Sequence, residues 1–371
     1  MVSQKKSIDV PPFTYWLSGI VEKHANTLIH LSKIETSYYQ EALEPIEIEQ
    51  PIFICGLARA GTTILLELLS THPDVATHQY RDFPMLYTPI WWNWFLDRMP
   101  KQPQAPVERA HKDGILVTPE SPEALEEVLW MKFFPHAHNP EVSSVLDTEA
   151  ENQPFEHFYK EHIRKILLVR RGHRYVSKGN YNFARIQYLL RLFPDARFLI
   201  LVRDPKTHIA SLMKQHHLLC REASRNERIL IHMRRGGHFE FGLDRRPINP
   251  NNISLTHEIL NLWLQGEEVK GWARYWAGLY EWMLETINRN EHLSRASLIV
   301  HYKELCDYPQ ETLTQVSQHC RLVFEKPHFD ELVVRLRYPS YYRVNFSDDE
   351  LAIIQEETQA VCQRLGIRAK T

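Results

Sequence analysis

A glycine-bounded loop follows a short apolar run and precedes a helical pattern near the start of the chain. The loop runs from Gly56 to Thr63, after the apolar residues 52–55 and before residues 64–69. A helix N-terminus presents unpaired N–H groups and the positive end of the helix dipole, so it suits a phosphate group. Gly56 and Gly61 let the backbone wrap closely around such an anion. The segment therefore predicts an anion-binding strand–loop–helix unit.

The loop keeps the spacing of a nucleotide-binding P-loop but lacks its lysine. That motif has the form G-x-x-x-x-G-K-[ST], and its lysine reaches the β- and γ-phosphates. Here Thr62 stands at the lysine position, and the cation is Arg59 inside the loop. The loop is therefore suited to a phosphate, but not to an ordinary nucleoside triphosphate with magnesium. A tight turn without a ligand is the alternative.

A second candidate anion site begins at Arg203, directly after the apolar run 197–202, with Ser211 eight residues further on. An arginine at the carboxyl end of a parallel strand lies where open α/β sheets bind ligands. Ser211 would lie two turns into the following helix and could offer its hydroxyl to the same anion. Alone, such a turn is more often structural. The motif supports an anion site only in combination with the loop at residues 56–63.

Strand and helix patterns alternate along the chain. This alternation predicts an α/β fold with a P-loop-like parallel sheet, helices on both of its faces, and helical additions. Residues 1–45 are predicted to form a helical extension and residues 46–371 a single domain. We expect strands at 52–55, 175–178, 197–202 and 297–300, and helices at 64–69, 186–190, 205–211, 255–292 and from about residue 310.

Three further segments carry structural expectations. Residues 83–119 are rich in Pro and Trp and are predicted to be irregular. The Trp91–Phe95 cluster is expected to pack in the core, with an acceptor site or a partner surface as the alternative. Ser121 is expected to cap a helix with Pro122 at its first position. The Arg-rich segment 221–250 is expected to be a long, mobile insertion with a solvated face, or alternatively a gate. The aromatic stripe 272–283 has helical spacing and is predicted to be core.

Composition excludes several classes of protein. The 371 residues carry a net charge of −2, so no overall attraction to nucleic acid or anionic membrane is predicted. The five cysteines never form C-x-x-C, and the 20 histidines show no H-E-x-x-H spacing, so we expect neither a disulfide framework nor a metal site. No apolar run suits a signal peptide or a bilayer span, which favours a cytoplasmic location.

In these motifs the chain resembles the sulfotransferases that use 3′-phosphoadenosine 5′-phosphosulfate (PAPS). Residues 56–63 look like their 5′-phosphosulfate loop, although Ala58 and Ala60 depart from its usual Pro and Ser. Residues 201–211 look like their 3′-phosphate motif. The stretch 178–198, with its lysine and its "LFPxxxF" sequence, is similar to bacterial and tyrosylprotein members, and residues 300–309 are similar to a late family element. The matches lie between residues 52 and 320.

The resemblance implies roles for individual residues. It assigns the 5′-phosphosulfate to Arg59, Ala60, Gly61, Thr62 and Thr63, and the 3′-phosphate to Arg203 and Ser211. Tyr302 is implied to lie near the adenine, and Lys178 to be the cation at the leaving-group oxygen. PAPS is then the donor and its desulfated form, PAP, the product. Oriented N–H groups and cations can stabilise the charge that develops during transfer.

The acceptor group, a hydroxyl or an amine, needs a general base to take its proton. Several sulfotransferase families place a carboxylate about twenty residues after the loop cation, where this chain has residues 78–83. Asp82 matches best by position, His78 is a substitute, and Glu123 is a third candidate. The acceptor stays open among carbohydrate, lipid headgroup, small natural product and peptide tyrosine, and so does the oligomeric state.

Two rival functions remain at this stage. The first is a P-loop kinase or nucleotide hydrolase, which the missing lysine disfavours and magnesium-dependent ATP binding would support. The second is a non-catalytic PAP-binding protein on the same fold, which the changed loop residues Ala58 and Ala60 keep open.

Overall fold

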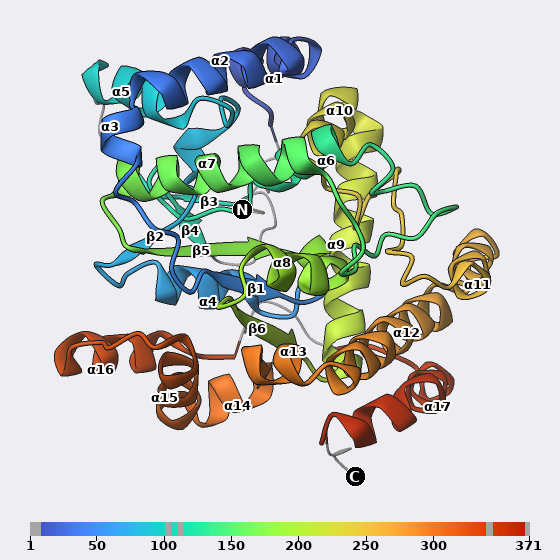
Figure 1. The fold of residues 1–371 in the computed structure, drawn as a ribbon. Helices are drawn as coiled ribbons and strands as arrows, with labels where there is room; N and C mark the ends of the chain where they lie inside the picture. The colour runs from blue at the N-terminus through green and yellow to red at the C-terminus, as the bar shows by residue number, and fades with distance from the viewer. Residues whose placement is uncertain (1–8, 101–104, 110–114, 339–343, 368–371) are drawn as a thin grey trace.

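The computed structural model describes residues 9–100, 105–109, 115–338 and 344–367. Its centre is a parallel five-stranded sheet with the strand order β2-β5-β1-β6-β7, beside a separate two-stranded antiparallel hairpin, β3-β4 (Figure 1). The strands are β1 (Ile52–Cys55), β2 (Val75–Ala76), β3 (Val107–Glu108), β4 (Leu116–Val117), β5 (Arg174–Gly179), β6 (Arg197–Val202) and β7 (Ser297–His301).

Helices make up most of the remaining chain. They are α1 (Pro12–Lys23), α2 (Ala25–Tyr38), α3 (Gln40–Leu43), α4 (Thr62–Leu69), α5 (Pro89–Arg98), α6 (Glu127–Phe133), α7 (Gln153–Arg170), α8 (Ile186–Leu192), α9 (Pro205–Arg225), α10 (Glu227–Gly236), α11 (Ile253–Leu264), α12 (Glu268–Arg289), α13 (Glu291–Ala296), α14 (Tyr302–Asp307), α15 (Pro309–Cys320), α16 (Lys326–Arg335) and α17 (Asp348–Arg364).

Alternate residues of the central strand enter two different cores. Phe53 and Cys55 pack with residues of α7, α8 and α12, whereas Ile52 and Ile54 pack with residues of α4 and α15. Successive side chains of a strand point to opposite faces of the sheet, so a strand covered on both faces must be apolar throughout. This confirms the predicted parallel sheet with helices on both faces.

The sheet order determines where the functional residues meet. Strand β1 lies between β5 and β6, with Ile54 level with Lys178 and with Leu199. All three strands are parallel, so their carboxyl ends reach the same edge of the sheet. The loop after Cys55, the end of β5 at Lys178 and the start of the turn at Arg203 therefore converge there, as expected at a topological switch point.

The aromatic stripe of α12 is buried, as predicted, and both Trp272 and Trp276 are almost inaccessible. The expectation for residues 83–119 was wrong in part, because Pro89 stands at the first position of α5. The Trp91–Phe95 cluster lies on this helix, with Trp94 and Phe95 exposed. The helix predicted from Ser121 begins only at Glu127, because the Ser121 hydroxyl accepts a hydrogen bond from Thr118 N (3.0 Å) in a turn.

The segment 221–250 contains the last turn of α9 and the whole of α10. Several of its arginines have internal partners. Arg235 pairs with Glu22 of α1 (2.8 Å), and Arg245 pairs with Glu268 of α12 (2.8 Å). Of the helices in the described part of the chain, none combines the length and apolarity that a bilayer span needs.

Candidate active site

The loop between β1 and α4 has the backbone of an anion cradle. Gly61 precedes the first helical residue in a left-handed conformation (φ 103°), and a Cβ on Gly56 (φ 153°) would lie 3.0 Å from the Leu201 carbonyl oxygen. Arg59 also has a positive φ (71°), which strains a residue with a side chain. Such strain is retained where the surrounding structure enforces it, often at functional sites.

Buried groups beneath the loop hold this conformation. The Trp276 indole N–H donates to His208 Nδ1 (3.1 Å), so the His208 proton lies on Nε2, which donates to the Ala58 carbonyl oxygen (2.8 Å). Burial, with a contribution from the Arg203 charge, lowers the pKa of His208 to about 3. His208 is therefore neutral at neutral pH, and α9 and α12 together fix the loop.

We expect His208 to make stability depend on pH. Its pKa is about 3 when folded and near 6.5 when unfolded, so the unfolded chain binds more protons between these values. The contribution is complete above pH 6.5 and is lost as pH falls, by roughly 2 kcal/mol between pH 7 and pH 5. Urea unfolding at both pH values should show a smaller loss for His208→Gln than for the wild type. An equal loss in both proteins would contradict the assignment.

The two predicted anion motifs meet at this loop. Arg203 Nη1 donates to the Arg59 carbonyl oxygen (3.1 Å), and Arg59 Nε donates to the Ser211 hydroxyl (3.3 Å). The Tyr302 ring lies against Gly61, where an added Cβ would be 2.4 Å from it, and its centroid is 4.9 Å from the Arg203 guanidinium carbon. Residues from β1, β6, α9 and α14 thus surround the N-terminus of α4.

Lys178 lies at the same edge of the sheet, near the end of β5. Burial lowers the pKa of this half-buried lysine, the Glu123 carboxylate acts in the opposite direction, and the charges of Arg109 and Arg59 lower it further. The lysine therefore stands among two carboxylates, those of Glu123 and Glu240, and two guanidinium groups. The backbone of Glu123 is fixed by a hydrogen bond from Glu123 N to the His78 carbonyl oxygen (3.0 Å). The neighbouring residues Gln79 and Pro122 form an antiparallel bridge.

Arg109 is a site residue that the sequence did not reveal. It follows β3, is only 7% exposed, and donates through Nη1 to the Thr63 hydroxyl (3.2 Å) in the first turn of α4. Its charge also acts on Tyr80, whose pKa is raised by burial and by Glu123. No motif or periodicity marks a lone arginine in this Pro-rich stretch, and the contact with Thr63 spans 46 residues.

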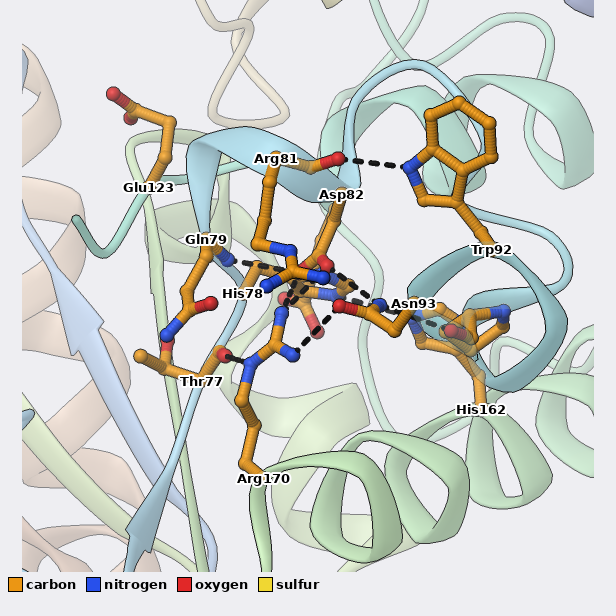
Figure 2. A network of polar contacts seen from close by, with 12 residues as sticks. Thr77, His78, Gln79, Arg81, Asp82, Trp92, Asn93, Glu123, His162 and Arg170 are labelled. Carbon is orange, nitrogen blue, oxygen red and sulfur yellow. Dashed lines mark hydrogen bonds and ion pairs between the residues drawn. The ribbon is translucent and has the colours of Figure 1, made fainter. Parts of the chain in front are cut away.

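Asp82 and His78 lie in a different environment from Lys178 and Glu123. Both Asp82 oxygens accept from Arg170 Nη2 (2.5 and 2.7 Å), and they also accept from Asn93 Nδ2 (3.0 Å) and from Gln79 N (2.8 Å). His78 Nε2 lies 3.0 Å from His162 Nε2. Figure 2 shows this cluster closed around Asp82, with the Glu123 carboxylate pointing away from it.

These contacts keep Asp82 ionised. Burial alone raises the pKa of Asp82, but the His78 imidazole, the Arg170 guanidinium and the Asn93 amide outweigh it and hold this pKa well below its usual range. Asp82 is 1% exposed, so its oxygens face protein groups and not an open site. Position in the sequence favours Asp82 over Glu123 as the base. No sequence signal indicates that Asp82 pairs with Arg170, which lies 88 residues away.

The geometry suits an anionic ligand, with arginines and a lysine near one helix N-terminus. Within the described residues, no group of three or more His, Cys, Asp or Glu side chains could hold a metal ion. The family model described as "Sulfotransferase family" matches residues 51–235, which include both anion motifs and Lys178. The chain belongs to this family.

Solved structures agree on the fold. Sulfotransferase STF9 from Mycobacterium avium superimposes with a TM-score of 0.53 at 14% identity, over 96% of this chain and 87% of that one. Sulfotransferase STF1 from Mycobacterium tuberculosis H37Rv gives a TM-score of 0.50 at 14% identity, over 89% and 81% of the two chains. A search of curated proteins gives no significant match.

Proposed function

We propose that the protein transfers a sulfuryl group from PAPS to an acceptor hydroxyl. The observation that carries this proposal is the meeting of the two anion motifs. Ser211 reaches Arg59 across 152 residues of chain, and Arg203 reaches the backbone of the same loop across 144. A donor with phosphate groups at both ends needs two such positive sites close together.

The residues present fit this donor. The loop from Arg59 to Thr63 offers backbone N–H groups at the start of α4 for the 5′-phosphosulfate, and a side chain at Gly61 would collide with Tyr302. Arg203 and Ser211, both largely buried, would hold the 3′-phosphate. Tyr302 is placed to contact the nucleoside. When bound, PAPS supplies an activated sulfuryl group.

The chemical step needs a cation for the leaving oxygen and a base for the acceptor. Lys178 would donate a hydrogen bond to the oxygen that gains charge, and Arg109, beside Thr63, would add a second positive charge. The acceptor hydroxyl gives its proton to a carboxylate as its oxygen forms the new S–O bond and the S–O bond to the nucleotide breaks. Both cations are preorganised by the protein, which avoids reorganisation during reaction.

We assign the base to Glu123 and not to Asp82 or His78. Asp82 already accepts four hydrogen bonds, and taking a proton would break its contacts with Arg170. His78 is almost inaccessible and faces His162. Glu123 is half-buried, and its charge acts on Lys178. Its carboxylate accepts from Ala124 N (2.7 Å) and from the Tyr80 hydroxyl, and among the described residues it has no arginine or lysine partner that a proton would displace.

Replacing Arg203 by alanine should weaken PAP binding about 100-fold, because hydrogen bonds to charged groups contribute about 1.5–3 kcal/mol. Calorimetric titration with PAP in the absence of magnesium measures this effect. Arg203→Lys should recover part of the affinity, and Arg221→Ala, an exposed arginine on α9, should bind PAP like the wild type.

The two rival functions predict different results in the binding experiments with PAP and ATP. A kinase or nucleotide hydrolase would bind ATP with magnesium and would not bind PAP. A non-catalytic PAP-binding protein would bind PAP normally and transfer no sulfuryl group to any acceptor in a panel. Absence of PAP binding in the wild-type protein would overturn the proposed donor.

A further inference from the structure

Helices α1, α2 and α5 lie in an outer layer at one end of the molecule, at the top of Figure 1. Trp91 N, in the first turn of α5, donates to Glu35 Oε1 of α2 (2.7 Å), so these two helices are neighbours. Large apolar side chains of this layer are at least 37% exposed. They are Phe13, Trp16, Ile20, Leu31, Ile34, Tyr38, Trp94, Phe95 and, directly after α5, Met99. We call this set the outer apolar surface.

The spacing within α1 and α2 places these side chains on one face of each helix. The three residues of α1 stand at positions i, i+3 and i+7, and the three of α2 repeat that spacing. Residues at this spacing share a face of an α-helix. Isolated exposed apolar residues are ordinary, but apolar stripes on neighbouring helices mark a surface that binds a partner.

The opposite faces of the two helices are attached to the body by polar groups. Arg235 of α10 pairs with Glu22 of α1 (2.8 Å), and the buried Lys165 of α7 pairs with Glu35 of α2 (3.1 Å). The side chains that the two helices bury are mostly small or polar: Ser18, Val21, Ala25, Ser32 and Glu35. A helix whose outer face meets only water has the reverse arrangement, with its larger apolar side chains turned inward.

The charges of this layer favour an anionic partner. Each carboxylate of α1, α2 and α5 has a basic partner, in the pairs Glu22–Arg235, Glu35–Lys165 and Asp97–Arg81. Lys23 and Lys33 are exposed, and neither has an ion-pair partner among the described residues. The exposed carboxylates of Asp9, Glu41 and Glu44 lie outside the three helices, before α1 and after α2. The helices themselves therefore present an excess of positive charge.

Apolar stripes interleaved with lysines are typical of helices that lie in the interface of a bilayer, where the apolar side chains enter the lipid and the lysines meet the headgroups. Interfaces between proteins also contain Trp and Tyr but are depleted in lysine. Lys33 stands between Leu31 and Ile34, inside the apolar stripe of α2. We propose that the outer apolar surface binds the surface of a membrane that contains anionic lipids. This inference is independent of the proposed sulfuryl transfer.

Flotation of the full-length protein with lipid vesicles tests the proposal. One set of vesicles is phosphatidylcholine alone, and the other is phosphatidylcholine mixed with phosphatidylglycerol. We expect binding to the mixed vesicles that is stronger than binding to phosphatidylcholine and that weakens at high salt, because salt screens the attraction between lysines and lipid headgroups. Absence of binding to the mixed vesicles would overturn the proposal.

Variants separate the apolar and the electrostatic contributions. Phe13→Ser/Ile34→Ser should lower the partition coefficient roughly 10-fold or more, because it removes apolar area from the lipid contact. Lys33→Gln should lower it about fivefold with the mixed vesicles and leave binding to phosphatidylcholine unchanged. The matched controls are Val334→Ser and Lys326→Gln, two exposed positions of α16 on the opposite side of the sheet in Figure 1. Both should bind like the wild type, and all these variants should keep its melting temperature.

A second copy of the chain is the alternative occupant of the outer apolar surface. Sedimentation equilibrium without lipid measures it. A dimer that Phe13→Ser/Ile34→Ser converts to a monomer, together with a wild type that does not float with vesicles, would assign the surface to a second copy and overturn the membrane proposal. Vesicle binding that the α16 variants weaken as much as the α1 and α2 variants would also overturn it.

Discussion

Replacing Glu123 by glutamine should lower kcat for sulfuryl transfer about 100- to 10,000-fold, the range usually lost with a general base. The affinity for PAP should stay within about twofold, because Glu123 is not among the groups at the α4 loop. Glutamine keeps the size of the side chain but cannot take a proton from the acceptor hydroxyl. Initial rates with saturating PAPS, together with PAP calorimetry, measure the two effects.

The matched comparison is Asp82→Asn. This variant should lower the midpoint of urea unfolding strongly, since it removes the charge that Arg170 faces. Any protein that remains folded should keep most of its kcat. The opposite pattern, with kcat lost in Asp82→Asn and retained in Glu123→Gln, would return the role of base to Asp82. Equal kcat in Glu123→Gln and wild type would also refute our assignment.

The sequence was sufficient to predict the elements that surround the anion-binding loop. Short apolar runs at 52–55 and 197–202 became the two central strands, and the rule for open α/β sheets placed Arg203 at the ligand edge. These short apolar runs identify the strands because a strand buried on both faces of a sheet must be apolar throughout. The glycines of the loop have the positive φ values that their positions require.

The surroundings of Glu123, Arg109 and Arg170 could not be predicted in the same way. Glu123 was expected at the start of a helix, but residues 121–123 instead pair with residues 78–80 as extended chain. Arg109 reaches Thr63, and Arg170 reaches Asp82, through contacts between distant parts of the chain. Such pairings depend on how loops pack on the sheet, and no periodicity within either segment encodes them.

The buried cluster around Asp82 should prove to be one of the main stabilising features of the fold. Arg170, near the end of α7, joins three parts of the chain through Asp82, Asn93 and the Thr77 carbonyl oxygen. Removing one member of a buried ion pair costs about 3–5 kcal/mol, because the other charge stays buried without compensation. Arg170→Met should therefore lower the free energy of unfolding by about this amount.

A second arginine of α7 supplies the control. Arg164 pairs with Glu161 at 2.6 Å, but its side chain is 35% exposed compared with 12% for Arg170. Arg164 also donates to the Ile46 carbonyl oxygen (3.1 Å), but its charge remains partly in contact with water. Such pairs contribute less than buried ones, so Arg164→Met should have a smaller effect in the same urea titration. Similar losses for the two variants would mean that α7 packing, and not the buried pair, accounts for the stability.

The double variant Asp82→Leu/Arg170→Met tests the electrostatic cause directly. If the penalty of Arg170→Met arises from an unpaired carboxylate, removing that carboxylate should restore part of the lost stability. The two changes should then be non-additive, with a coupling energy well above the few tenths of a kcal/mol seen for independent sites. Additive losses would show that Asp82 and Arg170 act separately. In that case the ionised state of Asp82 would depend on the His78 imidazole and the Asn93 amide and not on Arg170.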